Sequence, residues 1–279
     1  MPMDLMLRVD THEELGASHH LLTLSCPAGS PPLPRWQAGQ FAMVGLGLPA
    51  SSSDPLLRRP FSIFSLPEPG PEPPRHASFF YKILGRGSSL LSRIRPGESL
   101  RCLVPLGNGF APPRAHGQRL LLVGGGIGSA SVHPLGLQEM RDGRSALLLY
   151  GCRNADELAG AEPSRAAGME VRVATDDGSA GRRGFASDLL DDFLRAEGPG
   201  AAGRWIVCAC GPTPMMKATA EVARRHGVTC FLSLESPMAC GFGVCVGCVV
   251  GIQEPGQDAL RYRRICVDGP VFDAAAVTW

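Results

Sequence analysis

The chain has 279 residues, of which 44% are hydrophobic and 19% charged, with a formal net charge of +1. At roughly 150 residues per domain this length predicts about two domains that bury cores without disulfide staples, and the composition excludes extended disorder. The 27 basic and 26 acidic side chains form no block of like charge. The sequence therefore lacks the clustered positive charge that binding to nucleic acid or to an anionic membrane requires.

The first ten residues contain Asp4, Arg8 and Asp10. A signal peptide would need an apolar core there, so we expect a cytoplasmic protein. The stretch 236–253 has no charged residue, but its proline, glycines and cysteines make it a poor membrane span, and none is predicted. Ten cysteines in a cytoplasmic chain of this size favour metal binding over disulfide bonds.

Residues 1–112 are expected to form an antiparallel β-barrel domain. Short apolar runs, separated by proline and glycine, occur at 5–9, 21–26, 41–46, 61–66, 78–84 and 99–104. This spacing is typical of antiparallel barrels or sandwiches. The segments 49–55 and 67–74, the second rich in proline, are interpreted as hairpin loops because strand-like sequence resumes after each.

Residues 113–235 are expected to form a parallel α/β domain. Strand-like runs at 120–123, 146–150, 170–174, 205–209 and 229–234 alternate with helical patterns at 127–140, 186–196 and 213–226. Such alternation predicts a parallel sheet with crossover helices. The remaining segment, 236–279, is rich in cysteine and glycine and is interpreted as a small domain organised by a metal centre. The expected fold class is therefore multi-domain α+β.

Four cysteines in the last segment have the spacing of metal ligands. Cys240, Cys245 and Cys248 form a C-x4-C-x2-C run, and Cys266 follows after seventeen residues. This is the spacing of plant-type ferredoxins, which hold a [2Fe–2S] cluster on four thiolates, and the intervening glycines suit a tight loop. Zinc remains the alternative, although only the pair Cys245 and Cys248 has the short form of a zinc knuckle.

Two motifs in the barrel region have features that suit phosphate binding. Arg59 precedes a strand, and its guanidinium can pair with phosphate as a fork-shaped donor. Gly87 permits close backbone approach, and Ser88 can cap the helix that follows, where helix N-termini attract phosphate. Each motif alone is equally typical of an ordinary turn.

Two further turns lie in the α/β region. The run 120–123 leads into Gly124-Gly125-Gly126-Ile127-Gly128, the strand–turn–helix arrangement at which parallel sheets bind pyrophosphate. Ser129 stands where a complete motif has its last glycine. The second turn is 210–215, Cys-Gly-Pro-Thr-Pro-Met, in which a helix cap followed by proline also has a purely structural explanation.

Taken together, these motifs resemble the ferredoxin reductase superfamily. The resemblance implies FAD on Arg59, Pro60, Phe61, Ser62, Phe80, Tyr81, Lys82, Gly87 and Ser88. It also implies a nicotinamide nucleotide on Gly124, Gly125, Gly126, Ile127, Gly128, Cys210, Gly211 and Pro212. The segments 150–153 and 175–179 resemble the same superfamily. Whether Arg153 favours a 2′-phosphate is open, and NAD is preferred to NADP as the expectation.

Over nearly its full length the chain resembles the electron-transfer subunits of class 1B dihydroorotate dehydrogenases, most specifically at Cys266-Val-Asp-Gly-Pro-Val-Phe272. The resemblance implies that an FMN-containing partner subunit oxidises dihydroorotate in pyrimidine biosynthesis. Electrons then pass through the [2Fe–2S] cluster and FAD to NAD, in a heterotetramer with two copies of each subunit. A flavin suits this position because it exchanges both single and paired electrons. No catalytic acid–base residues are predicted on this chain.

Two alternatives remain. Related electron-transfer subunits serve hydrogenases or NADH-dependent ferredoxin:NADP reductases. The sequence shows only the subunit that these systems have in common, and does not identify its partner. A protein of another class, a regulatory module that holds zinc or a cluster as a switch, would contain the cysteines without a functional flavin site.

Overall fold

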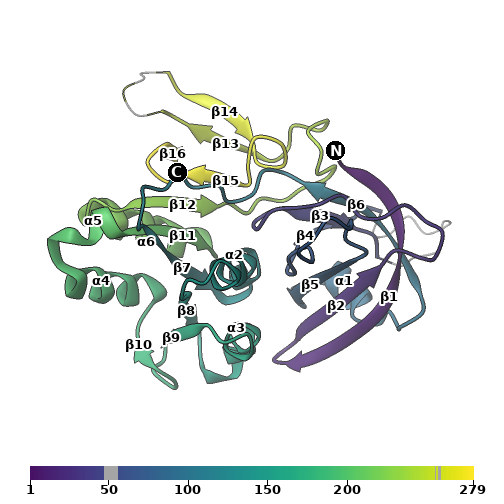
Figure 1. The fold of residues 1–279 in the computed structure, drawn as a ribbon, viewed down its shortest axis with the longest axis horizontal. Coiled ribbons are helices and arrows are strands. Elements are labelled where there is room, and N and C mark those ends of the chain that lie inside the picture. Colours follow the sequence, from purple (N-terminus) through teal and green to yellow (C-terminus); the bar gives the residue numbers. More distant parts are fainter. Residues whose placement is uncertain (47–55, 255, 257–258) are drawn as a thin grey trace.

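A computed structural model describes residues 1–46, 56–254, 256 and 259–279. It contains an antiparallel barrel, a seven-stranded sheet flanked by helices, and a small three-stranded sheet (Figure 1). The hairpin loop expected at 49–55 lies outside the described residues. No helix within the described part of the chain has the length and apolar character needed to cross a bilayer.

The barrel confirms the antiparallel prediction. Its strands are arranged in the order β4-β3-β6-β1-β2-β5 and comprise β1 (Met3–Gly16), β2 (His19–Ser25), β3 (Phe41–Val44), β4 (Arg59–Ser62), β5 (His76–Lys82) and β6 (Ser99–Leu106). The Phe64 N–H donates to the Ser78 carbonyl at 2.7 Å, which brings the two edge strands together and nearly closes the barrel. Fully buried Leu22, Phe79 and Leu100 fill its interior. Helix α1 (Arg86–Leu91) follows β5.

The central sheet confirms the predicted parallel α/β organisation. Its order is β10-β9-β8-β7-β11-β12-β15, with bounds β7 (Arg119–Gly125), β8 (Leu147–Cys152), β9 (Glu170–Thr175), β10 (Arg182–Arg183), β11 (Trp205–Cys210), β12 (Thr229–Ser233) and β15 (Val271–Asp273). All neighbouring strands are parallel except β12 and β15. Chain order reverses between β7 and β11, and such a switch point opens a crevice at the carboxyl ends of the strands.

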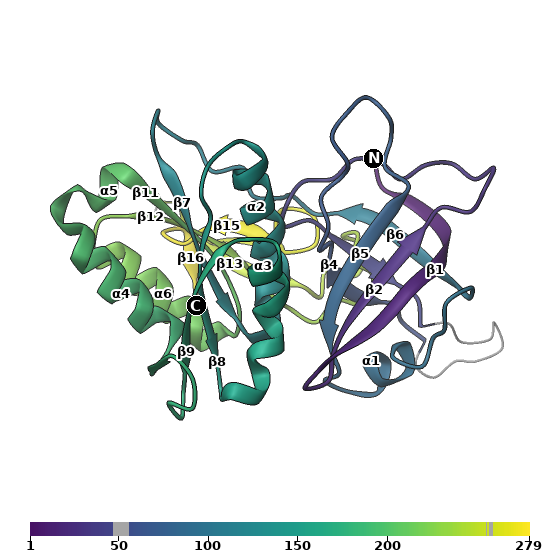
Figure 2. The same ribbon diagram turned by 60° about the horizontal axis from the view of Figure 1, so that its bottom comes forward.

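Helices cover both faces of this sheet (Figure 2). They are η1 (Gly126–Gly128), α2 (Ser129–Arg141), η2 (Ala155–Gly160), α3 (Glu162–Ala166), α4 (Ala186–Glu197), η3 (Gly198–Gly200), α5 (Ala201–Arg204) and α6 (Thr213–Arg225). Leu122 of β7 packs with Leu135 of α2, whereas Leu121 packs with Leu190 of α4. Side chains alternate between the faces of a strand, so one buried strand supplies both cores.

The C-terminal segment forms a sheet in the order β14-β13-β16, with β13 (Val249–Ile252), β14 (Arg261–Arg264) and β16 (Val277–Thr278). The chain also adds β15 to the central sheet, where Phe272 pairs with Leu232 of β12. The sequence analysis did not anticipate this strand. The boundaries 1–112, 113–235 and 236–279 stay a prediction.

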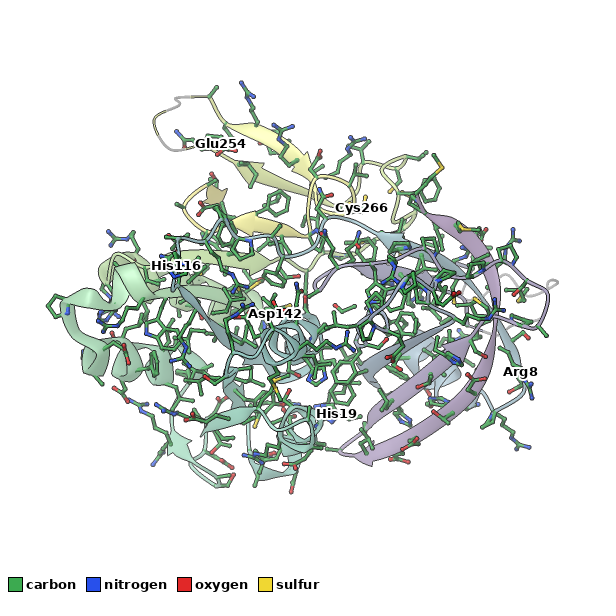
Figure 3. All side chains as sticks on the ribbon, viewed as in Figure 1. Arg8, His19, His116, Asp142, Glu254 and Cys266 are labelled. Atoms are coloured by element: carbon green, nitrogen blue, oxygen red, sulfur yellow. The ribbon has the colours of Figure 1, made fainter. Side chains whose placement is uncertain are left out.

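The barrel and the α/β domain meet through an apolar and aromatic interface. His133 of α2 stacks on Phe64 with ring centroids 4.0 Å apart, and His133 Nδ1 lies 2.9 Å from the Ser164 hydroxyl. Phe80 and Ile127 pack in the same interface. Figure 3 places His19, near the tip of the β1–β2 hairpin, at this junction.

The proline-rich loop 67–74 has identifiable anchors. Arg141, in the last turn of α2, donates to the Pro67 carbonyl at 2.8 Å, and Arg35 donates to the Glu72 carbonyl at 2.8 Å. The loop is therefore attached to the helix that faces the barrel.

The buried imidazole of His133 predicts sensitivity to acid. Burial lowers the pKa of His133 to about 4, whereas an unfolded histidine has a pKa of about 6.5. The unfolded chain therefore binds an additional proton as the pH falls from 6.5 toward 4, and the free energy of unfolding decreases by up to about 3 kcal/mol in that window. The midpoint of urea unfolding between pH 7 and pH 4.5 measures this loss.

A His133→Phe variant retains the ring stacking and removes the titration. We expect its urea midpoint to depend less on pH between 6.5 and 4.5 than that of the unmodified chain. Equal pH dependence in the two proteins would refute the assignment to His133.

Candidate functional site

A cavity of about 470 Å³ lies where the barrel, the central sheet and the C-terminal segment meet. The barrel supplies an aromatic wall of Phe41, Phe61, Phe80 and Tyr81, and the polar groups of Ser62 and Lys82. The chain after β12 supplies the opposite wall, comprising Leu234, Glu235, Ser236, Pro237 and Met238. A flat, mostly apolar site with a few polar groups fits the ring system of a flavin.

The structure brings the two predicted flavin motifs together. Pro60, Phe61, Ser62, Phe80, Tyr81 and Lys82 line this first cavity, whereas Arg59, Gly87 and Ser88 lie outside its lining. Arg59 nevertheless contacts the second motif, because a Cβ at Gly87 would lie 2.8 Å from Arg59 Nε. Arg59 directly precedes the wall residue Pro60, and its guanidinium donates to the Leu57 carbonyl at 2.6 Å.

Ser88 has a structural role in its own turn. Its hydroxyl accepts the N–H of Leu84 at 2.9 Å and that of Gly85 at 3.2 Å. Ser88 was expected to cap the helix that follows it, but it lies within α1 (Arg86–Leu91), and its side chain accepts the N–H of the N-cap residue Gly85. Its contact with FAD stays a prediction.

Two histidines support the aromatic wall from within the barrel. The His12 Nε2 atom lies 2.9 Å from the Tyr81 hydroxyl, and His20 stacks on the Tyr81 ring with centroids 5.3 Å apart. Burial raises the pKa of Tyr81, so the phenol stays protonated. The sequence analysis missed both histidines, because only the register of β1, β2 and β5 places them beside Tyr81.

A second cavity, of about 640 Å³, lies at the carboxyl ends of β7, β8, β9 and β11. Of the predicted nicotinamide residues, Gly125, Gly126, Ile127 and Pro212 line it, Cys210 lines the first cavity, and Gly124, Gly128 and Gly211 line neither. A Cβ at Gly128 would lie 2.5 Å from the Cys210 carbonyl oxygen. Glycine there lets the two predicted turns pack directly on each other.

Lys82, Leu84, Ile127 and Glu235 line both cavities. Burial raises the pKa of Glu235, while a weak hydrogen bond from the Cys210 thiol, at 3.9 Å, opposes the shift. The sequence analysis missed Glu235, although an acid that directly follows the last parallel strand is a recognisable signal.

An ion pair crosses from the barrel to the α/β domain beside this shared wall. Lys82 Nζ of β5 lies 2.9 Å from Glu157 Oε1 of η2, and each side chain is only 14% exposed. Burial opposes ionisation of Glu157, but hydrogen bonds and charges from Arg153 and Lys82 lower its pKa to about 2. Glu157 therefore stays ionised at neutral pH.

The four predicted ligand cysteines come together as two pairs. The Cys240 and Cys245 sulfurs are 3.3 Å apart near the surface, and the thiols of Cys248 and Cys266 share a hydrogen bond in the interior. No disulfide joins any of the ten cysteines. The other six are buried, as expected for small core residues.

Backbone N–H groups of the cysteine loop point at the sulfurs. Burial opposes ionisation of Cys240, but the N–H groups of Cys245, Phe242 and Val244 lower its pKa to about 6. Burial, followed by the Cys248 thiol, raises the pKa of Cys266 to about 12. Amides aimed at sulfur stabilise thiolate ligands and the cluster that they hold.

The pairing of the thiols tests which metal the loop fits. A [2Fe–2S] cluster has two iron atoms and takes four thiolates, whereas zinc takes four ligands at a single point. Among the described residues, no group of three His, Cys, Asp or Glu side chains is arranged to hold one metal ion. The two pairs of thiols, Cys240 with Cys245 and Cys248 with Cys266, match the two thiolates that each iron of such a cluster takes.

The cysteine loop lies next to the first cavity. Met238 lines that cavity, and Cys240 follows two residues later. Gly241, with a φ of +80°, packs on the barrel so closely that a Cβ there would overlap Met43 of β3. Figure 3 shows Cys266 close to the point where the yellow C-terminal segment meets the barrel.

Comparison with known proteins gives a consistent result. A family model described as the iron-sulfur cluster binding domain of dihydroorotate dehydrogenase B matches residues 235–278. The solved structure of an NADH-dependent reduced ferredoxin-NADP oxidoreductase superposes with a TM-score of 0.77 at 27% identity, covering 98% of this chain and 90% of that one. A Neisseria gonorrhoeae ferredoxin NADP+ reductase with bound FAD and NADP shares the fold at a TM-score of 0.62 and 18% identity, with coverages of 80% and 92%.

Full-length relatives are more similar in sequence. A dihydroorotate dehydrogenase B (NAD(+)) electron transfer subunit homolog from Aquifex aeolicus is 34% identical over 267 residues, which cover 95% of this chain and 96% of the relative. The electron transfer subunit from Geobacillus sp. is 38% identical over 240 residues, 86% of each chain. This chain belongs to the family of dihydroorotate dehydrogenase B electron transfer subunits.

Proposed function

We propose that this protein passes electrons between an FMN-containing subunit that oxidises dihydroorotate and NAD, by way of a [2Fe–2S] cluster and FAD, in pyrimidine biosynthesis. The observation that carries the proposal is the continuity of three sites. Residues 233–248 run from the wall of the first cavity to the cysteine loop. Lys82, Leu84, Ile127 and Glu235 form a wall common to both cavities.

Each site suits one group. A nicotinamide exchanges a hydride, a [2Fe–2S] cluster exchanges one electron, and a flavin exchanges either. A chain that holds all three can therefore collect single electrons from the cluster and pass them on in pairs to NAD. The aromatic wall of the first cavity would hold the flavin, with Arg59 beside Gly87 to pair with its phosphates. The glycine turns after β7 and β11 would hold the dinucleotide in the second cavity.

Cys240, Cys245, Cys248 and Cys266 would hold the cluster, with the outer pair of thiolates facing the surface. Phe242, Val244 and Val246 surround that pair and are 52%, 73% and 57% exposed. Exposed apolar residues around a redox centre suit contact with another protein. We therefore place the catalytic partner subunit on this rim, in an assembly of two subunits of each kind. The ten unpaired cysteines support a cytoplasmic location.

One alternative has specific support. The structural similarity to an NADH-dependent reduced ferredoxin-NADP oxidoreductase indicates that the same three sites can serve another partner. The function is therefore tested with the partner present. The chain is co-expressed with an FMN-containing dihydroorotate-oxidising subunit from the same genome, and the purified complex is assayed for dihydroorotate-dependent NAD reduction. Turnover that requires both subunits supports the proposal, whereas failure to form a complex overturns it.

Loss of one ligand of the outer thiol pair should separate the two halves of the electron path. We expect Cys245→Ser to retain NADH-dependent reduction of an artificial dye at the flavin. Dihydroorotate-to-NAD turnover in the complex should fall at least about 100-fold, because the cluster loses a thiolate. Iron content and the visible spectrum measure cluster loading.

Cys26→Ser is the matched control, because Cys26 is a buried thiol in the barrel core. It should change neither iron content nor turnover. Full dihydroorotate-to-NAD turnover in Cys245→Ser would contradict the proposed ligand set.

Removal of the Arg59 guanidinium should weaken FAD binding. A hydrogen bond between charged groups contributes about 1.5–3 kcal/mol, so Arg59→Ala should raise the Kd for FAD about 10- to 100-fold. Titration of the FAD-depleted chain with FAD measures the effect. Arg35→Ala, a change in a loop anchor that lies outside both cavity linings, is the control and should leave the Kd unchanged. An unaltered FAD affinity in Arg59→Ala would exclude a phosphate contact.

A further inference from the structure

The second cavity carries a charge arrangement that bears on which dinucleotide it accepts. In doubly wound sheets the adenosine ribose lies near the ends of the strands next to the glycine turn. An acidic residue there binds the ribose 2′-hydroxyl, and an arginine accommodates a 2′-phosphate. Both kinds of residue occur here, because Arg153 follows β8 and Asp176 follows β9, and both line the cavity. The residue types alone leave the choice open.

The geometry of Arg153 decides between these possibilities. Its guanidinium forms an ion pair with Glu157, four residues later, and Arg153 Nε lies 2.9 Å from Glu157 Oε1. The same carboxylate oxygen accepts Lys82 Nζ at 2.9 Å. Lys82 and Arg153 are the lysine and arginine in the cavity lining, so one acidic residue engages both cations of the described wall.

The position of Glu157 is itself determined by the core. The hydroxyl of the fully buried Tyr150 donates to the Glu157 carbonyl at 2.9 Å, which fixes the backbone of η2 against β8. Lys82 approaches from the barrel, so the carboxylate is held from two domains. The Glu157 side chain is only 14% exposed, which limits its ability to swing away when a ligand enters.

We propose that Glu157, together with Asp176, excludes a 2′-phosphate from the second cavity and thereby selects NAD over NADP. NADP adds a phosphate to the two negative charges of the pyrophosphate. Here the added phosphate would meet an arginine that is already paired with Glu157 and the negative charge of Asp176. Binding it would require drawing the Arg153 guanidinium, on a side chain that is 74% exposed, away from Glu157, whose side chain is only 14% exposed. The buried Glu157 carboxylate would then have one partner fewer. NADP is thus disfavoured because Arg153, the cation that could bind its 2′-phosphate, is already paired with Glu157.

This inference rests on the proposed function, because it takes the second cavity as the dinucleotide site. The test therefore uses two redox-inert probes, ADP-ribose and 2′-phospho-ADP-ribose, titrated onto the full-length, FAD-loaded chain by calorimetry. The unmodified chain should bind ADP-ribose at least about tenfold more tightly. Glu157→Gln should reduce the ratio of the two dissociation constants about tenfold, chiefly because 2′-phospho-ADP-ribose binds more tightly. Asp176→Asn should reduce the same ratio.

Two further variants separate the charge effect from other causes. Asp177→Asn removes the same charge one residue beyond Asp176, but Asp177 does not line the cavity, so the ratio should stay unchanged. In the double variant Glu157→Gln/Arg153→Ala the released guanidinium is absent and only Lys82 is freed, so the phosphorylated probe should bind less tightly than to Glu157→Gln. Because Glu157 pairs with Lys82 of the barrel, its variants could also alter the contact between the two domains, so their melting temperature and FAD content are measured. Asp176→Asn tests the inference without removing that ion pair.

The outcomes are distinct. A ratio that is the same in the unmodified chain, Glu157→Gln and Asp176→Asn overturns the inference while leaving the dinucleotide site intact. Absence of binding of either probe to the unmodified chain overturns the assignment of the cavity, and the inference with it. The ratio of kcat/KM for NADH and NADPH in dye reduction should follow the ratio of probe affinities.

Discussion

The return of the C-terminal chain to the central sheet is the constraint on which the relation among the three sites depends. The chain leaves β12 at Ser233, forms the cavity wall and the cysteine loop, and comes back as β15, which pairs with β12. The Leu234 N–H donates to the Pro270 carbonyl at 2.9 Å, so both ends of this excursion are held together. The Asn108 N–H donates to the Gly269 carbonyl at 2.6 Å, which ties the same point to the end of the barrel. The cysteine loop is therefore held at a definite place beside the first cavity.

The junction between the barrel and the α/β domain combines an ion pair with a larger apolar contact. An isolated buried ion pair contributes little net stability, because desolvation offsets the attraction between its charges. The apolar contacts around Phe64, Phe80 and Ile127 and the neutral stack of His133 on Phe64 account for the adhesion of the two domains. Lys82 and Glu157 lie at the edge of that interface, where two cavities meet.

Much of the architecture could be predicted from local pattern. The alternation of short apolar runs identified the strands of the barrel and of the parallel sheet, because side-chain periodicity reflects which face is buried. The glycine turn at 124–128 was recognised from its position between a strand and a helix, and the turn at 210–215 from its resemblance to the reductases. The structure adds that the two turns pack on each other, since a Cβ at Gly128 would lie 2.5 Å from the Cys210 carbonyl oxygen. Strand β15 was missed because three residues carry too little periodicity. Glu157 and His12 were missed because Lys82 and Tyr81, the residues that they contact from the other side of the fold, are 75 and 69 residues away in the chain.

The sequence by itself determined the parts: the elements, the glycine turns, the aromatic and arginine motifs, and the four cysteines with their ferredoxin spacing. These properties are local, since spacing and residue type decide strand periodicity, turn geometry and ligand chemistry within a few positions. Only the tertiary structure decided the relations between the parts. It placed Arg59 on Gly87, arranged the thiols as two pairs, and gave Lys82 and Glu157 a common boundary between two cavities. By its residue type alone, Arg153 at the end of β8 would suit a phosphate, but in the structure it pairs with the Glu157 carboxylate. Lys82, which binds the same carboxylate, lies on a strand 75 residues away in the chain.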